Sequence, residues 1–528
     1  MPYTTNMMSR ANRLILLLLV LVLLPLSGQA TNPEDSLLLG LTSVTTQRLN
    51  PFTSVEREMM SLTALIYEGL VQIDDDYNPR PCLAERWESS SDGRTWYFTL
   101  REGLMFHDGS PLTASDVVAS AHEIKRLVDD ETVASKGPYA SLRYFIDDIQ
   151  SNDNLTVVIR TSRPNYGFLY AMTFPVVPQA QVGADNPPGT GPYIADAFVP
   201  KDYMLLSKNP LWWNGSVTVG QIMTIFHATN RDLISSYEYN RVDAILTRSL
   251  TAAQYRSGMN SFNLTYRTRQ LETLMMNNRS VELNDILVRK AIRHAINLNA
   301  ITSTTYMNMA ARTDTLMPVG TWMYNDNAGR HEYNPDLARE MLDAAGWIDG
   351  DDEDTIREKM IDGKKRNLVL RFFVYEEQEN SVRLSTAHQI AGMLADVGIH
   401  VNVKAMSFTQ AREALKSGSF DLCLAAFQMD VAPDPGFLLM RGNTGNYSRY
   451  QSKEMDELFK SLRSATKRED YQMLLYQIQS RFFEDCPFIS LYYRSGAVLT
   501  RKMFTNARDM REPEVLRGIA ESRRSAGE

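Results

Sequence analysis

Cysteine is scarce in this sequence, with three residues among 528. Cys82, Cys423 and Cys486 allow one disulfide and leave at least one thiol unpaired in a monomer, and the sequence does not choose the pair. No two of them have the spacing of metal ligands. A metal site built on cysteine is therefore not expected.

Motifs of known catalytic chemistry are missing as well. The seven histidines are scattered without an HExxH or HxxxH pattern, which argues against a zinc enzyme. The chain has no G-x-S-x-G, Walker A or dinucleotide-binding fingerprint. Carboxylate pairs such as Asp147/Asp148 and Asp351/Asp352 lie in polar stretches typical of solvated loops. We expect no catalytic residue, no metal and no cofactor.

An excess of positive charge is also absent, since 55 Lys and Arg face 63 Asp and Glu for a net charge of −8. This balance argues against a nucleic-acid partner and against an anionic membrane surface.

Apolar runs long enough to span a membrane are not found. The run Leu14–Leu24 has eleven residues, follows Arg10 and Arg13, and precedes the small residues Gly28-Gln29-Ala30. This order predicts a secretory signal peptide over residues 1–30, cleaved near Thr31, and an uncleaved anchor is the alternative.

The composition that is present, 44% hydrophobic and 22% charged, is that of a soluble globular protein. At this length two or more lobes are expected. The clearest unit is a crossover with parallel strands, β-α-β-α-β. Its strands are expected at 368–375, 399–403 and 420–427, and its helices at 382–397 and 409–416.

Further elements follow from the same periodicities. A helix should begin at Asp285 with Asn284 as its cap, and another should follow Asn334-Pro335. The segment 346–366 reads as a polar surface loop and the tail from Arg501 as surface. Strands are also expected at 37–41, 154–160, 271–277 and 488–493, and helices at 63–71 and 456–474.

The stretch from Leu83 to Leu127 has the most distinctive local pattern. Asp92-Gly93 predicts a two-residue hairpin turn, and Trp96, Phe98 and Leu100 then alternate with polar residues as in a half-buried strand. Thr113 and Asp116 form the spacing of a capping box ahead of a helix whose apolar residues are Val117, Ala121, Ile124 and Leu127.

The wording of that stretch, LAERW followed by DGRTWYFTLREG and FHDGSPLTASDV, resembles the signature of family 5 extracellular solute-binding proteins. These are the dipeptide, oligopeptide and nickel-type capture subunits of ABC importers. Further matches are GTGPY at 189–193, NP with WNG at 209–215, and the D-x-x-VR-x-A pattern that begins at Asp285.

The resemblance implies an α/β, two-lobed periplasmic-binding-protein-like fold of the class II or cluster C type. Lobe 1 would span 31–270 with an extra subdomain at about 61–162, and lobe 2 would span 271–487. Residues 488–528 would return to lobe 1 and form the tail. The chain would cross between lobes near Leu271 and Phe488, and the ligand would lie in the interlobe cleft.

The implied function is capture of a peptide or peptide-like solute outside the cytoplasm by lobe closure. The solute would pass to the transmembrane permease subunits of an ABC transporter and their cytoplasmic ATPase, with the binding protein acting as a monomer. Many relatives carry a lipid-modified cysteine at the cleavage point. Ser27–Asn32 contains no such lipobox cysteine, so a freely soluble periplasmic protein is expected if the cell has an outer membrane, and the uncleaved anchor is favoured if it has none.

One segment matches the family's ligand-binding loop, Ala426–Pro435, AFQMDVAPDP. It follows the third crossover strand, at the end where open α/β sheets place their ligands. By the resemblance, Asp430 would pair with the ligand's α-ammonium group, Phe427 takes the place of the family's Trp, and Met429 lies beside them. The alternative is that Asp430 caps its own loop.

Other candidate contacts are tyrosines near strand ends, Tyr375, Tyr492 and Tyr493, and the residues after the first strand, Thr42, Ser43 and Val44. For each of them core packing is the alternative reading.

The ligand's identity stays open at this point. Dipeptide binders place an Arg after the strand equivalent to 368–375, where this chain has Glu376 and Glu377, although Arg371 or Arg383 could substitute. Longer peptides, cationic compounds, a nickel chelate, haem or a sugar are the alternatives. A secreted hydrolase is the alternative from another class of protein.

Overall fold

The computed structural model describes residues 36–131, 137–255, 257, 261–349, 355–376, 382–501 and 510–518. The predicted signal peptide lies outside these residues. Within the described part, no helix combines the length and the apolar character needed to cross a membrane.

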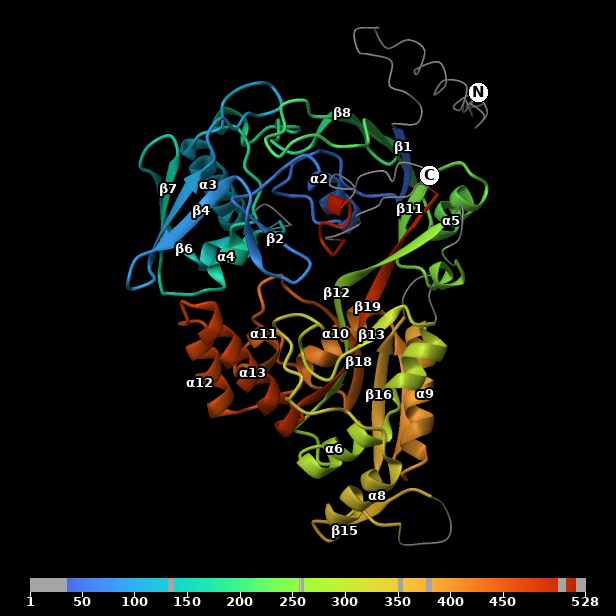
Figure 1. The fold of residues 1–528 in the computed structure, drawn as a ribbon. Helices are drawn as coiled ribbons and strands as arrows, with labels where there is room; N and C mark the ends of the chain where they lie inside the picture. Colours follow the sequence, from blue (N-terminus) through green and yellow to red (C-terminus); the bar gives the residue numbers. More distant parts are fainter. Residues whose placement is uncertain are drawn as a thin grey trace, which may run out of the picture.

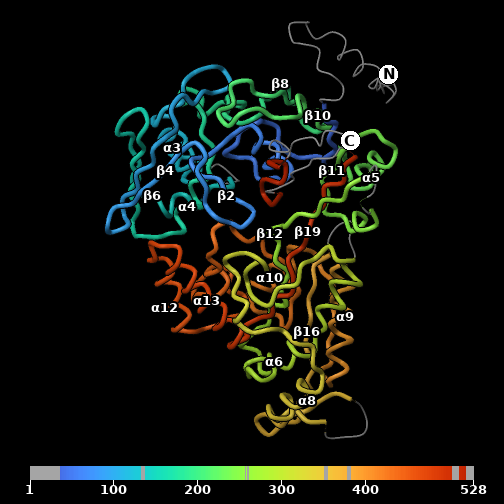
Figure 2. The backbone as a smooth tube through the Cα atoms, viewed as in Figure 1, coloured from blue at the N-terminus to red at the C-terminus, as the bar shows by residue number. Residues whose placement is uncertain are grey.

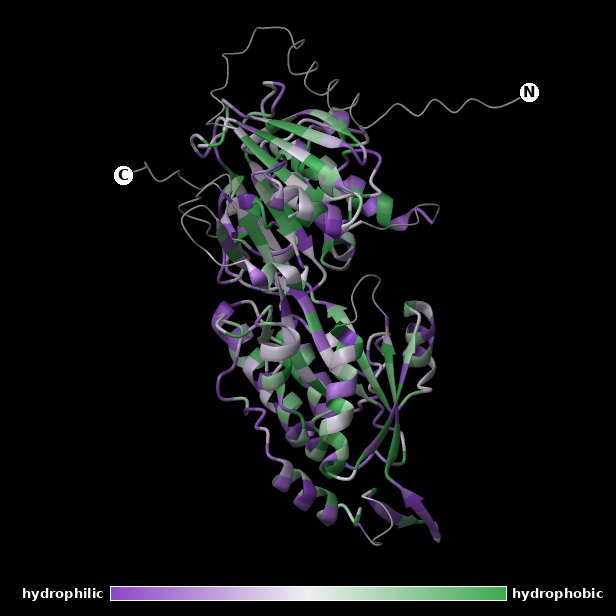
Figure 3. Cartoon of the chain, turned by 90° about the vertical axis from the view of Figure 1, so that its right-hand side faces the viewer, coloured by the Kyte–Doolittle hydropathy of each residue, from purple (hydrophilic) through white to green (hydrophobic). Residues whose placement is uncertain are grey.

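Two long antiparallel strands join an upper and a lower lobe (Figure 1). β12 (Phe262–Met276) and β19 (Phe488–Thr500) pair along an upper and a lower part, and their register shifts between Arg267 and Leu271 and again between Glu272 and Thr273. The upper part continues into the sheet of the upper lobe through β11 (Ala244–Thr247), whereas the lower part continues through β18 (Leu422–Gln428). The first shift therefore lies at the waist that Figure 3 shows between the lobes.

The sheet of the upper lobe is ordered β19-β11-β1-β10-β9-β8. β1 (Ser36–Thr42) confirms the predicted first strand and is parallel to β10 (Gln221–His227), with Leu37, Leu39 and Leu41 buried. The other members are β9 (Tyr203–Lys208) and β8 (Tyr193–Val199), and α5 (Asn230–Glu238) packs on β1.

A second sheet of four antiparallel strands stands beside it in the order β4-β5-β7-β6. The predicted alternation is confirmed, because Trp96, Phe98 and Leu100 are buried. So is the capping box, in which the Thr113 backbone N–H donates to Asp116 Oδ2 at 2.8 Å. The elements are β4 (Ala84–Ser89), β5 (Thr95–Leu100), β6 (Ile146–Ser151), β7 (Thr156–Thr161) and α3 (Ala114–Asp129).

The turn between β4 and β5 differs from the prediction. A two-residue turn needs positive φ at both central residues in type I′ and at the first in type II′, but here Gly93 has φ of 66° and Asp92 does not have a positive φ. The chain instead forms a loop from Ser90 to Arg94, in which the Ser90 side chain accepts the Thr95 N–H at 2.9 Å.

The crossover in the lower lobe is confirmed. β16 (Val369–Tyr375) lies parallel to both β17 (His400–Met406) and β18, giving the order β17-β16-β18-β12. The connecting helices are α9 (Val382–Ala395) and α10 (Phe408–Ser417). Leu370, Phe372 and Val374 are fully buried in the core of this lobe.

The helices of the lower lobe agree with the sequence except at two points. Asn334 caps α8 (Pro335–Ala344) as predicted, but the cap of α6 (Ile286–Ala295) is Asp285, whose side chain accepts the Leu287 N–H, and not Asn284. The single helix expected at 456–474 is two helices, α12 (Lys453–Leu462) and α13 (Arg468–Asp485). The chain leaves the helical path between them, where the Ala465 carbonyl accepts the Tyr166 N–H.

The expected helix at 63–71 is also wrong. α2 (Arg57–Thr63) ends where that helix should begin, and β2 (Val71–Ile73) follows. The backbone of Glu68 and Gly69 bonds to Val176 and Leu83 instead of to a helical turn. The short elements that complete the fold are β3 (Pro79–Pro81), α4 (Phe168–Ala171), α7 (Leu298–Ala300), β13 (Ala310–Arg312) and α11 (Gly436–Leu439).

The insert expected as a loop contains a hairpin, β14 (Glu358–Ile361) and β15 (Lys364–Asn367). Asp362 and Gly363 form its turn, with φ of 50° and 72°, which is the positive-φ pair of a two-residue hairpin. Asp351 and Asp352 lie outside the described residues.

The tail is not a surface segment where the structure describes it. Met510, Arg511, Glu512, Val515 and Leu516 are buried against the upper lobe. The charges of this segment are compensated internally, since Glu512 pairs with Arg248 and Arg511 donates to the carbonyl oxygens of residues 73 and 74.

The cysteines are all free and buried, so the disulfide that the sequence allowed is not formed. Burial raises the pKa of each thiol, that of Cys423 to about 12, which keeps all three protonated and unreactive at neutral pH.

Candidate functional site

The predicted ligand loop lines cavities between the lobes together with Arg269 of β12, one of the two strands that Figure 2 traces from one lobe to the other. Two small cavities meet there. One, of about 20 Å³, is lined by the loop Met429–Pro435 together with Tyr77, Leu316, Met323 and Tyr493. The other, of about 60 Å³, is lined by Ile73, Tyr139, Tyr170, Arg511 and Glu514. Arg269, Asp430 and Val431 line both.

Asp430 is exposed and shapes its own loop. Its Oδ1 accepts the backbone N–H of Val431 at 2.6 Å and of Ala432 at 3.4 Å. The capping role that the sequence left open is therefore present. Because one carboxylate oxygen is enough for this role, Oδ2 is left for another partner, and a role in ligand binding stays a prediction.

Met429 and Tyr493 flank the same cavity. The Met429 backbone N–H donates to the Arg269 carbonyl oxygen at 2.8 Å, which ties the loop to β12. The Tyr493 hydroxyl donates to the Leu316 carbonyl oxygen at 2.6 Å, and burial raises the pKa of the phenol. Of the residues predicted to contact ligand, the structure brings these two and Asp430 together.

The other predicted contacts lie away from the two cavities. Phe427 stacks with Tyr447 and meets Phe437 edge-to-face, with ring centroids 6.2 and 6.3 Å apart. Tyr375 lies against Arg383, and Tyr492 has no exposed surface and donates to the Tyr306 hydroxyl at 2.9 Å. A ligand contact at Tyr492 would require this packing to change.

The residues after the first strand belong to the upper lobe. Thr42 donates to Glu58 Oε1 at 3.1 Å, the Ser43 backbone N–H donates to the His227 carbonyl oxygen at 2.7 Å, and Val44 is 2% exposed. Their role as ligand contacts also stays a prediction.

Neither arginine considered as a substitute carboxylate site is available. Arg383 forms a two-bond ion pair with Glu272, with distances of 2.7 and 2.8 Å, and both side chains are buried. Arg371 forms a similar pair with Asp421. Both guanidinium groups are therefore committed within the protein.

Arg269 is the cleft residue that the sequence reading missed. It stands on β12 at the shift in register, its backbone N–H donates to Glu512 Oε2 at 3.2 Å, and the residue lines both cavities. The alternation of Arg267 and Arg269 just ahead of the crossing was the signal available in the sequence.

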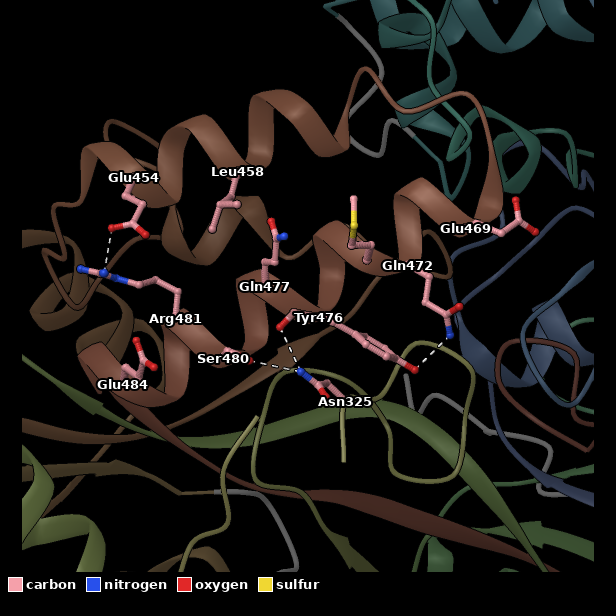
Figure 4. A pocket seen from close by; sticks show the side chains of 11 residues that line it. Asn325, Glu454, Leu458, Glu469, Gln472, Tyr476, Gln477, Ser480, Arg481 and Glu484 are labelled. Atoms are coloured by element: carbon pink, nitrogen blue, oxygen red, sulfur yellow. Dashed lines mark hydrogen bonds and ion pairs between the residues drawn. The ribbon is translucent and has the colours of Figure 1, made fainter. Parts of the chain in front are cut away.

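The larger hollows lie elsewhere. A groove of about 610 Å³ runs along α12 and α13 on the lower lobe, where Arg481 pairs with Glu454 and Asn325 bonds to Ser480 (Figure 4). This groove is open and belongs to one lobe. We favour the smaller interlobe cavities because residues of both lobes and of the crossing strand converge there.

In the described part of the chain, no group of three or more His, Cys, Asp or Glu side chains is placed to hold a metal ion.

Residues 78–449, more than half of the chain, match the family model described as "Bacterial extracellular solute-binding proteins, family 5 Middle". The chain belongs to this family. It is 23% identical to the nickel-binding periplasmic protein of Escherichia coli (strain K12), covering 87% of this chain and 89% of that one. It is 23% identical to the oligopeptide-binding protein AppA of Bacillus subtilis (strain 168), covering 84% and 83%.

The crystal structure of NikA from Brucella suis in complex with Fe(III)-EDTA has a TM-score of 0.76 to this structure at 22% identity, covering 90% of this chain and 99% of that one. This likeness confirms the predicted two-lobed α/β fold of periplasmic binding proteins. The protein is an extracytoplasmic solute-binding protein, and the nickel-binding relative from Escherichia coli is named as a periplasmic protein.

Proposed function

We propose that this protein captures a peptide-like solute in the periplasm by lobe closure and delivers it to the permease of an ABC importer. It acts as a monomer and performs no chemistry on the solute. The observation that carries the proposal is the position of Asp430, an exposed carboxylate in the interlobe cleft with one oxygen spare.

The chemistry of this position suits an ammonium group. A carboxylate enclosed by a closing cleft is costly unless a cation meets it, and charge-assisted hydrogen bonds from an α-ammonium compensate that cost and fix which end of the ligand enters. The two cavities hold about one to a few water molecules each, so a peptide needs the lobes to move relative to one another.

Mass spectrometry of the ligand carried by natively purified protein, released by denaturation, tests the proposal. We expect short peptides with free amino termini. A nickel chelate, haem or a sugar as the bound species would contradict it and support the corresponding alternative.

Incubation with a defined peptide mixture separates capture from hydrolysis. We expect each peptide to be recovered intact, because the described cleft has neither a nucleophile–base pair nor a metal cluster. Cleavage products that increase with protein concentration would support the hydrolase instead.

The route to the periplasm is a predicted cleaved signal peptide without a lipid. Intact-mass measurement of the naturally exported protein should show a chain beginning near Thr31. A diacylglyceryl adduct, or a retained Met1, would contradict this part of the proposal.

A further inference from the structure

An arginine without a partner stands at the centre of the cleft. Among the described residues, the Arg269 guanidinium has no hydrogen bond or ion pair, and its Nε is both shielded from solvent and unsatisfied. Two neighbouring arginines are engaged, Arg248 with Glu512 and Arg511 with the backbone of residues 73 and 74. A half-buried cation in this state is unfavourable unless something outside the protein pairs with it.

The backbone holds Arg269 in place independently of its side chain. Its N–H and its C=O are both used, by Glu512 and Met429, on a strand whose pairing with β19 is interrupted at this point. Its charge acts on both cavities, because it offsets part of the rise that burial causes in the pKa of Tyr77 and of Tyr139. The backbone of Arg269 is therefore fixed at the cleft by hydrogen bonds that do not involve its side chain.

We propose that Arg269 binds a carboxylate of the ligand, and that the ligand is a zwitterion whose cationic end meets Asp430. This inference rests on the proposed function and extends it to the chemical class of the solute. Arg269 and Asp430 line both cavities, yet no ion pair joins them in the described structure, so each charge is available to a separate group of one small molecule.

The guanidinium favours a carboxylate for geometric reasons. Its planar fork of N–H donors matches the two carboxylate oxygens, and the low-dielectric cleft strengthens such a pair. In a peptide the carboxylate comes either from the C-terminus or from an Asp or Glu side chain, and the two sources can be separated by amidation.

The test uses the full mature chain and two matched peptide libraries of two to five residues, one with free C-termini and one amidated. Peptides retained by wild type are identified by mass spectrometry, and the affinity of the best one and of its amide is measured by calorimetry. We expect amidation to weaken binding to wild type about 30-fold or more. Retention of amidated peptides that all contain Asp or Glu would support Arg269 with a side-chain carboxylate as the source.

Arg269→Met should bind the free peptide more weakly than wild type by about the same factor, and the amide by less than about threefold. The reason is that amidation and the substitution remove the same interaction. Arg269→Lys should recover part of the loss. The control is Arg267→Met, which removes an equal charge from an exposed side chain on the same strand that does not line either cavity, and it should stay within about threefold of wild type.

Equal losses of Arg269→Met on the peptide and on its amide would overturn the inference while leaving peptide capture intact. A loss of peptide affinity in Arg267→Met as large as that in Arg269→Met would also overturn the inference. The effect would then come from the general electrostatic field and not from a direct contact. Cooperative unfolding shows that the wild-type protein is folded. If such protein retains neither library, the proposal of peptide capture is wrong, and the inference fails with it.

Discussion

Asp430 combines two roles at the scale of a single residue, and they can be separated. Asp430→Asn keeps an acceptor for the Val431 N–H and removes the negative charge. We expect it to weaken the binding of a free-amine peptide by about 2–5 kcal/mol and to leave the free energy of unfolding nearly unchanged. N-acetylation of the peptide should cost wild type a similar amount and cost the mutant little more, as calorimetry of the four combinations measures.

Asp434 supplies the matched control for this cycle. It pairs with Arg463 through distances of 2.6 and 3.1 Å and accepts the Gly436 N–H, so Asp434→Asn should reduce stability more than it changes the effect of acetylation. If the losses from Asp430→Asn and acetylation simply add, Asp430 does not hold the amine.

The burial of His331 predicts how the stability of the protein depends on pH. His331 is 3% exposed and bonded to the Ile296 carbonyl oxygen, and burial lowers its pKa from 6.5 to about 3. Below about pH 6.5 the His331 imidazole of the unfolded chain therefore binds a proton, whereas in the folded protein it stays neutral until the pH approaches 3. The free energy of unfolding falls as the pH drops from about 6.5 to about 3. Titration of His331 should lower the free energy of unfolding by about 2 kcal/mol between pH 7 and pH 5.

Urea unfolding at the two pH values measures that cost as a difference between variants. His331→Gln should lose about 2 kcal/mol less than wild type on acidification, whereas the exposed His388→Gln should follow wild type. Identical losses in wild type and His331→Gln would show that His331 does not titrate in this way.

The tail segment shows how an element far along the chain stabilises the waist. Burial alone would raise the pKa of Glu512, but the Arg248 guanidinium outweighs it and the pKa is held below its usual value. Glu512→Gln removes the carboxylate that neutralises Arg248, so we expect a loss of about 3 kcal/mol in the free energy of unfolding, measured by urea at pH 7. Glu457→Gln, which breaks the exposed pair with Lys460, should cost less than about 0.5 kcal/mol, and a comparable loss in both variants would contradict the account.

Elements with strong periodicity and local caps could be predicted from the sequence. The crossover strands β16 and β18 and the cap at Asn334 depend on neighbours in the chain, so their positions were readable. The buried tail was not, because the partner of Glu512 is more than 250 residues away at Arg248. The β14–β15 hairpin was missed although its Asp362-Gly363 turn was present in the sequence, since flanking charges hid the strand pattern.

The cleft was predictable to the same extent. The motif located Asp430 at the end of β18, but alternation along a strand gives the face of a side chain and not its depth. Tyr492 and Tyr493 are neighbours in the sequence, yet Tyr492 is enclosed in the core of the lower lobe and Tyr493 lines the cleft. The availability of Arg269 depends on which arginines find acidic partners, and that is decided by tertiary packing.

At the scale of the whole molecule, we expect bending where the strands cross between the lobes. β12 and β19 are continuous through both lobes. Their pairing is broken between Arg267 and Leu271 and shifts again between Glu272 and Thr273, so a change of twist over this segment need not disrupt the regular ladders above and below it. Arg269 stands within this break and Asp430 beside it. A ligand that binds both residues would therefore directly influence the angle between the lobes.

Closure on ligand is the prediction at this scale. A peptide that binds between the lobes should reduce the radius of gyration measured by small-angle scattering, because it draws the lobes together around the broken ladder. At a hundredfold excess over Kd it should also raise the free energy of unfolding by about 2.7 kcal/mol through mass action alone. Asp430→Asn at the same ligand concentration should show less of both effects, since weaker binding populates the closed form less. Stabilisation of wild type without any change in the scattering profile would establish a rigid site and rule out the hinge.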